Sequence, residues 1–353
     1  MAQTNPEKES RCWITHRAAI IPLPERSAVQ RHPKKMADVA LRFPRPGPRL
    51  PYGGKAKYLK AYTSGWNERD CAEFIEELRR FAAGEPNDKG VAINLATAAD
   101  RLLRVGGVLH HRTLHAALQN DPTWRQALDQ SAAYHFLGYE LDACRWLYAS
   151  ATAQGKEWGW LNFSGTLNNI AHCLMAGWTE RAAGQTHLLL RALKRNCVLG
   201  NAHKARTQFF VMRLLADWQG VPDYLKQWPK WARDEPLFTR LLEIWRTPDA
   251  TAELGHLLLV ACDRRTHQSS SSDKKHYDLP HIWQWYDPFE IVAVMKLRTL
   301  AGLELPTLDH PILDSPLGRL PEPSVPYDDE LLATIRARAR VLHPDVGPNC
   351  SAC

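Results

Sequence analysis

The strongest constraint on the fold is a helical spacing of apolar residues that recurs along the chain from residue 66 onwards. In the first such stretch, four apolar side chains fall on one helical face: Phe74, Ile75, Leu78 and Phe81. Clean alternation of apolar and polar residues is nearly absent, and neither an Asn-Gly nor an Asp-Gly hairpin turn occurs. We therefore expect an all-α fold, built as a multi-helix bundle or as stacked antiparallel helix hairpins, with no substantial sheet.

Glycine, proline and short polar side chains indicate where the helices begin and end. Gly84 suits the end of the first helix, and the pair Gly106 and Gly107 is expected to close the second. Asp121 and Pro122 are expected to open a long central helix as its N-cap and its first residue. The expected helical segments are 67–84, 90–105, 109–119, 122–155, 157–176, 178–199, 202–218, 236–246, 249–265 and 328–342.

The net charge of +7 belongs to the N-terminal part of the chain. Residues 1–60 contain 13 Lys and Arg against 4 Asp and Glu, whereas residues 61–353 contain 32 against 34. We therefore expect residues 1–60 to form a basic, Pro-rich and largely disordered extension, with Met36 as an alternative start of the protein. Within it, residues 44–54 should be either a linker or a loop strapped onto the body.

The rest of the chain is expected to form a single all-α domain over residues 61–345. A flexible loop is expected at 267–276, where four consecutive serines occur, and a frayed tail at 346–353. Because the excess of basic over acidic residues is confined to the extension, we do not expect nucleic-acid binding. No apolar run is long enough to span a membrane. The eight cysteines, most of them widely spaced, indicate free thiols in a reducing compartment, which favours a cytoplasmic protein.

Few residue patterns indicate chemistry. His111 and His115 share a helix face in the pattern His110-His111-x-x-x-His115, but no carboxylate at helical spacing completes a metal site. Asn168 and His172 share another helix face, which a core helix with a few polar residues also explains. We therefore expect no catalytic residues, no metal and no cofactor.

The stretch HIWQWYDPFEIVAVMKLRTLAG, residues 281–302, leads to a family resemblance. An aromatic entry, a proline, an apolar helix with Glu290 near its start and a following Leu-Asp-His-Pro turn occur within residues 278–320. This region resembles the C-terminal part of bacterial polymorphic-toxin immunity proteins, either the immunity protein 49 family or the immunity proteins of PoNe-type DNase toxins. The resemblance implies a cytoplasmic all-α protein that occludes a cognate toxin delivered by contact-dependent or type VI secretion.

The same stretch allows predictions for individual residues. Asp287 should be the N-cap of a helix and Pro288 its first residue. Glu290 should lie in the first turn, where the helix dipole favours a carboxylate. Asp309 and His310 should cap or brace the next turn. The core-facing residues of the helix should be Phe289, Val292, Ala293 and Leu297.

Toxin binding would require a few well-placed anchor residues, which are often aromatic or charged. The candidates for partner contact are Trp283, Trp285, Tyr286, Glu290, Asp309 and His310. Two alternatives remain open: an all-α enzyme with a pocket near Trp283, Trp285 and Glu290, and a helical adaptor protein. The oligomeric state is not indicated by the sequence.

Overall fold

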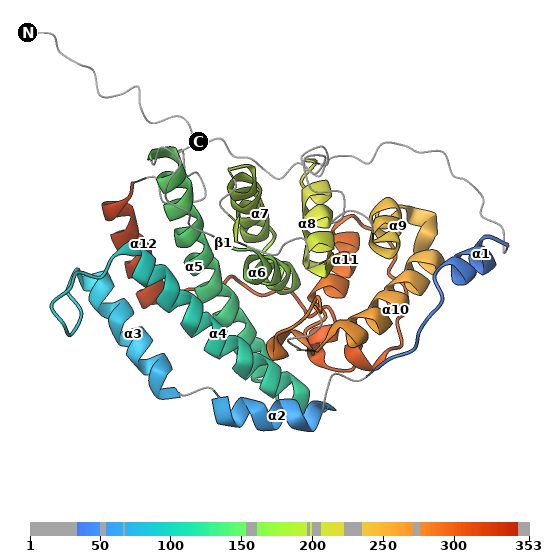
Figure 1. Ribbon diagram of the computed structural model, residues 1–353, viewed down its shortest axis with the longest axis horizontal. Helices are drawn as coiled ribbons and strands as arrows, with labels where there is room; N and C mark the ends of the chain where they lie inside the picture. Colours follow the sequence, from blue (N-terminus) through green and yellow to red (C-terminus); the bar gives the residue numbers. More distant parts are fainter. Residues whose placement is uncertain are drawn as a thin grey trace, which may run out of the picture. The chain divides into compact units, whose positions relative to one another are not determined.

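The structure, a computed structural model, describes residues 34–49, 54–65, 68–152, 161–195, 198–199, 206–221, 235–270 and 276–344. These residues contain twelve α-helices (Figure 1): α1 (Lys34–Arg42), α2 (Gly54–Gly65), α3 (Glu68–Ala83), α4 (Leu95–Gln119), α5 (Trp124–Thr152), α6 (Phe163–Ala176), α7 (Thr179–Lys194), α8 (Arg206–Trp218), α9 (Pro236–Ile244), α10 (Thr251–Gln268), α11 (Phe289–Leu300) and α12 (Glu330–Leu342). Four short 3-10 helices are also present: η4 (Pro248–Ala250), η5 (Ile282–Gln284), η6 (Pro311–Leu313) and η7 (Pro316–Gly318). The only sheet within the described residues is a parallel pair of two-residue strands, β1 (Leu161–Asn162) and β2 (Val198–Leu199). The predicted all-α class is confirmed.

Several predicted features lie outside the described residues in whole or in part. They are residues 1–33 of the basic extension, residues 50–53 of the linker or strap, residues 271–275 of the serine-rich loop, the C-terminal tail at 346–353, and parts of the expected helices 122–155, 157–176, 178–199 and 202–218. No helix in the described ranges is both long enough and apolar enough to cross a membrane. No disulfide joins the four described cysteines, which are all buried: Cys71, Cys144, Cys173 and Cys262.

Helix α4 continues through Gly106 and Gly107, so the predicted helix end at this pair is wrong. The reason lies in the neighbouring helix α5, which packs along α4. A β-carbon on Gly106 would lie 2.5 Å from Cδ2 of His135 on α5. The hydroxyl of Ser131, also on α5, donates a hydrogen bond to the carbonyl of Gly106 at 2.8 Å. The glycine therefore permits a close approach of two helices instead of ending one.

The turn between α4 and α5 also differs from its prediction. Asn120 ends α4 in the left-handed region with φ 57°, and α5 begins at Trp124, two residues later than expected. The carboxylate of Asp121 accepts hydrogen bonds from the backbone N–H and the hydroxyl of Thr123, at 2.9 and 2.8 Å. Asp121 therefore braces the turn, and it is not the N-cap that the sequence predicts.

Helix α6 is the central element of the fold, because it contacts α5, α7, α8 and α11 (Figure 1). Its side chains are buried from Gly165 to Ala176, which is unusual for a helix at a protein surface. Asn162 caps its start by accepting a hydrogen bond from the N–H of Gly165 at 3.0 Å. Gly177, with φ 85°, ends it and leads directly into α7. Polar residues on α6 therefore face other helices and not solvent.

Residues 34–49 and 54–65 correct the prediction of a largely disordered extension up to residue 60. They contain α1, α2 and a Pro-rich connection, residues 43–49, which we call the N-terminal strap. Two histidines of α10 donate hydrogen bonds to strap carbonyls: His256 to Phe43 at 2.8 Å and His267 to Gly47 at 3.0 Å. The backbone of a Pro-rich segment cannot form helical hydrogen bonds, so side chains of α10 satisfy it. Of the two alternatives for this region, the strap is the one observed.

After α11 the chain runs through η6 and η7 to α12, which packs against α3 and α5. Arg298, fully buried near the end of α11, connects this helix to the end of α9. Its guanidinium donates hydrogen bonds to the carbonyls of Trp245 at 2.8 Å, Thr247 at 3.1 Å and Glu304 at 2.8 Å. The buried charge is thereby satisfied by carbonyl groups at helix ends and turns.

Candidate functional site: a buried histidine and aspartate cluster

The aromatic segment leads into α11 one residue later than the sequence predicts. Pro288 occupies the N-cap position, and α11 begins at Phe289. Asp287 makes no capping hydrogen bond, because its carboxylate is turned towards α6. The predicted capping role of Asp287 is therefore wrong, although its position beside the helix start is as expected. The predicted core residues of α11, namely Phe289, Val292, Ala293 and Leu297, are all buried.

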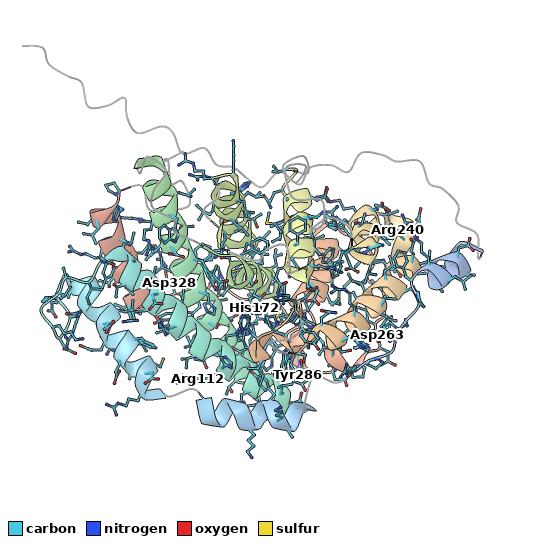
Figure 2. All side chains as sticks on the ribbon, in the orientation of Figure 1. Arg112, His172, Arg240, Asp263, Tyr286 and Asp328 are labelled. Carbon is cyan, nitrogen blue, oxygen red and sulfur yellow. The ribbon has the colours of Figure 1, made fainter. Side chains whose placement is uncertain are left out.

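Asp287 meets two histidines that come from two different helices. His172 of α6 donates a hydrogen bond from Nε2 to Oδ2 of Asp287 at 2.9 Å. His110 of α4 places its Nε2 at 3.8 Å from the same oxygen. The rings of His110 and His172 lie 5.0 Å apart between centroids. The exposed fractions of His110, His172 and Asp287 are 4%, 2% and 0%, so solvent is excluded from the cluster. Figure 2 labels His172 within the packed interior.

The charge state of the cluster follows from its environment. Burial opposes ionisation of Asp287, but the attraction and hydrogen bond of His172, with the nearby His110 and Arg265, hold its pKa below the usual value. For His110, burial and then repulsion from His172 place the pKa well below its usual value. The cluster therefore contains a carboxylate and a neutral imidazole, each able to offer a lone pair.

Several polar atoms of this cluster have no hydrogen-bond partner among the described residues. They are both ring nitrogens of His110, Nδ1 of His172, Oδ1 of Asp287 and both side-chain polar atoms of Asn168. Asn168 precedes His172 by one helical turn on the same face of α6. Each buried polar atom without a partner costs about 1–3 kcal/mol. Such a concentration of unsatisfied atoms at one place needs a physical explanation, for which a bound water or ion is one option.

A buried ion pair fixes the backbone beside the cluster. Arg265 of α10 pairs with Glu290 in the first turn of α11, and both side chains are buried. The same guanidinium donates to the carbonyls of Gln284 and Asp287. Glu290 thus lies in the first turn, as expected, and its main partner is a buried arginine. Arg265 thus bonds the backbone at both ends of the turn from 284 to 287. These bonds fix the position of the Asp287 backbone, from which the carboxylate extends towards α6.

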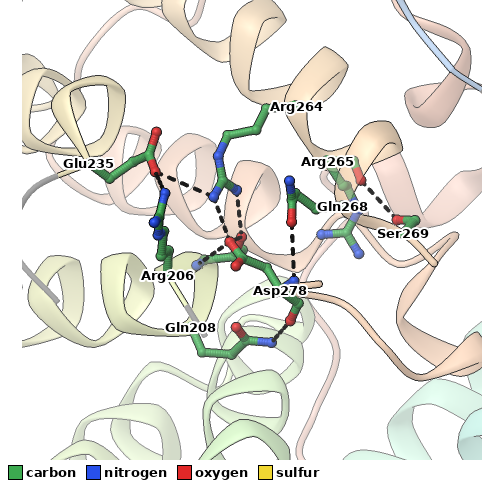
Figure 3. A network of polar contacts seen from close by, with 9 residues as sticks. Arg206, Gln208, Glu235, Arg264, Arg265, Gln268, Ser269 and Asp278 are labelled. Atoms are coloured by element: carbon green, nitrogen blue, oxygen red, sulfur yellow. Dashed lines mark hydrogen bonds and ion pairs between the residues drawn. The ribbon is translucent and has the colours of Figure 1, made fainter. Parts of the chain in front are cut away.

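A second polar network lies between α8, α10 and the loop before η5 (Figure 3). The carboxylate of Asp278 accepts hydrogen bonds from Arg264 at 2.6 Å and from the backbone N–H of Thr207 at 3.2 Å. The side chain of Gln208 donates to the carbonyl of Asp278 at 3.0 Å. Asp278 therefore joins the first turn of α8 to the aromatic segment. Its negative charge is favoured at this end of α8 by the helix dipole.

A third network surrounds Asp263 of α10, which Figure 2 labels. Its carboxylate accepts hydrogen bonds from Arg45 of the N-terminal strap at 2.9 and 3.1 Å, and from Nε2 of His310 at 3.0 Å. Nδ1 of His310 accepts from the N–H of Ile312 at 3.1 Å, so the proton of the neutral ring is on Nε2. His310 therefore caps η6, which confirms the expected bracing role.

The six candidates for partner contact divide into two groups. Trp285, Tyr286, Glu290 and His310 are buried and already engaged in packing, ion-pair or hydrogen-bond contacts, so they have little surface to offer a partner. Trp283 is partly exposed, with its ring stacked on exposed His281 at 5.6 Å and set edge-on to His110 at 5.7 Å. Asp309 is exposed. Only Trp283 and Asp309 of the six therefore have substantial surface available to a partner.

Comparison of the chain with protein-family models, with curated proteins and with solved structures gives no match. The assignment of the site therefore depends on its geometry. The sequence pattern drew attention to His111 with His115, whereas the structure brings His110 together with His172 and Asp287. The sequence shows His110 next to His111, and it shows polar residues on one face of α6. However, no local sequence pattern indicates that α4, α6 and the turn before α11 meet.

Proposed function

We propose that this protein is a cytoplasmic immunity protein that binds and neutralises a cognate secreted toxin by occlusion. The observation that carries the proposal is the resemblance of residues 278–320 to the C-terminal part of such proteins. The all-α architecture agrees with that resemblance. The structure adds support because the resembling segment forms a rigid framework, in which Asp278, Glu290 and His310 are fixed by polar contacts.

A rigid framework suits inhibition by occlusion, because a preorganised surface loses little conformational freedom on binding. The partly exposed Trp283 and the exposed Asp309 supply one aromatic and one charged contact on this segment. The alternative of an enzyme pocket near Trp283, Trp285 and Glu290 has less support. Trp285 donates its indole N–H to the carbonyl of Leu279 at 3.1 Å, and Glu290 is already paired with Arg265.

The test is co-expression of the protein with the product of a neighbouring gene that kills the host when it is expressed alone. The proposal expects survival of the host and co-purification of the two proteins. Asp309→Arg should weaken co-purification, because it reverses a charge at the proposed contact surface. Glu85→Arg, at an exposed position on the loop after α3, is the matched control and should leave binding unchanged. Failure of the unmodified protein both to protect and to bind would reject the proposal.

A further inference from the structure

We propose that His110, His172 and Asp287 form a binding site for a divalent transition metal ion of the zinc class. The three residues come from α4, α6 and the turn before α11, so one ion would connect three segments that are far apart in the sequence. Their donor atoms all lie within 4.8 Å of one another, and all three residues are buried. This inference is separate from toxin binding and does not depend on it.

The spacing of the donor atoms fits an ion between them. Zinc binds imidazole nitrogen and carboxylate oxygen at about 2.0–2.2 Å, so two ligands of a tetrahedral ion lie roughly 3.3 Å apart. The observed separations from Oδ2 of Asp287 are 2.9 Å to His172 and 3.8 Å to His110. These values lie on either side of the expected spacing. The third separation, between the donor atoms of the two histidines, is within 4.8 Å.

The chemical type of the donor atoms indicates the class of metal. Two imidazoles and one carboxylate are typical ligands of zinc and of neighbouring transition metals, whereas magnesium and calcium prefer oxygen ligands only. On binding, the ion would take the place of the proton on Nε2 of His172, and the neutral ring would carry its proton on Nδ1. Three protein ligands leave a fourth position, as in many zinc sites that bind a water molecule.

His110 distinguishes a metal site from a simple hydrogen-bonded pair. The hydrogen bond between His172 and Asp287 forms without an ion. His110, in contrast, is buried with neither ring nitrogen paired among the described residues, although its Nε2 points at the carboxylate of Asp287. A metal ion accepts the lone pair of that nitrogen. The side chain of Asn168, one helical turn before His172 on α6, also has no hydrogen-bond partner among the described residues.

The surroundings of the cluster support a preorganised site. Arg265 fixes the backbone of Asp287 by bonding its carbonyl, and the ring of Trp283 packs edge-on against His110. Groups that hold ligands in this way contribute strongly to metal affinity. A buried water molecule is the competing occupant, since it would also satisfy polar atoms in such a place.

The experiment measures metal binding by the purified full-length chain. We expect about one zinc per chain by elemental analysis after dialysis against trace zinc, and a visible absorption band of tetrahedral cobalt after Co²⁺ replaces it. His110→Gln should weaken zinc binding at least about tenfold, because loss of groups that only support a ligand already costs that much. His111→Gln is the matched control, since His111 is the next residue of α4 and equally buried but outside the cluster.

Circular dichroism of both variants establishes that they are folded before their affinities are compared. If His110→Gln does not fold, zinc and cobalt titration of the unmodified chain, in competition with a chelator, decides the question. Binding of zinc by the unmodified chain that survives in His111→Gln and is lost in His110→Gln supports the site. Absence of zinc and cobalt binding by the unmodified chain, or equal binding by both variants, overturns it.

Discussion

The close approach of α4 and α5 at Gly106 leads to a prediction with a calculable size. In Gly106→Ala the new β-carbon would lie 2.5 Å from Cδ2, 2.7 Å from Cγ and 2.9 Å from Nε2 of His135. Carbon atoms in contact normally lie about 3.5–4.0 Å apart, so the ring must move by roughly 1 Å. That movement would strain the hydrogen bond between His135 and the backbone of Leu103.

Two opposing terms decide the result of this substitution. Alanine favours a helix interior over glycine by about 1 kcal/mol. Overpacking of a filled interface costs about 1–3 kcal/mol, and the rigid imidazole on a neighbouring helix gives little room for relief. The net effect of Gly106→Ala is therefore a loss of up to about 2 kcal/mol in the free energy of unfolding, measured by urea denaturation with circular dichroism.

Gly184 in α7 provides the matched control. A β-carbon there meets no atom within 4 Å, so only the helix preference acts. Gly184→Ala should raise the free energy of unfolding by about 0.5–1 kcal/mol. The reasoning is refuted if Gly106→Ala stabilises the protein as much as Gly184→Ala does, because the close contact with His135 would then carry no cost.

Three further substitutions test other polar contacts. Arg298→Met should lower the free energy of unfolding by about 3 kcal/mol in urea denaturation, because buried carbonyls would lose their donor; a loss below about 1 kcal/mol would contradict this. Burial raises the pKa of Asp142 to about 6, so the unfolded chain releases this proton first and the native state loses stability as pH rises from about 4 to 6. Asp142→Asn should therefore raise the midpoint of thermal unfolding at pH 7.5 and leave it unchanged below pH ~4; an equal gain at both pH values would reject the electrostatic cause. Burial opposes ionisation of Asp263, but its hydrogen bonds to Arg45 and His310 lower its pKa. The ionised carboxylate therefore stabilises the native state at neutral pH, and this contribution is lost as pH falls below about 4. Arg45→Ala should lose about 1 kcal/mol at pH 7 in urea denaturation, with a smaller difference from the unmodified protein at pH ~3.

The sequence predicts the helices well where local spacing determines them. The expected segments 236–246 and 249–265 correspond closely to α9 and α10, and Gly84 does end α3 with a positive φ of 78°. The errors occur where contact with another segment determines the structure. The local sequence at Gly106 predicts a helix end, but the helix continues, and the close packing of His135 explains the glycine.

The candidate site shows the same limit more clearly. Asp287 before Pro288 has the local pattern of a helix cap, yet its carboxylate bonds to His172, 115 residues away. The histidine of α4 that approaches this carboxylate is His110, whereas helical spacing favoured His111 with His115. Local sequence patterns do not determine how one helix is rotated about its axis relative to another. The aromatic segment can be recognised in the sequence, but its buried polar partners could not be predicted from it.

The N-terminal strap has a consequence for the order of events during synthesis. Arg45 and its partner Asp263 are separated by 218 residues. A ribosome that adds about 5–20 residues per second produces Asp263 roughly 10–40 s after Arg45. His310, which shares the same carboxylate, emerges later still. The strap is therefore made among the first described residues and docks among the last, so the growing chain presents an undocked basic segment to nascent-chain proteases and chaperones until α10 is complete.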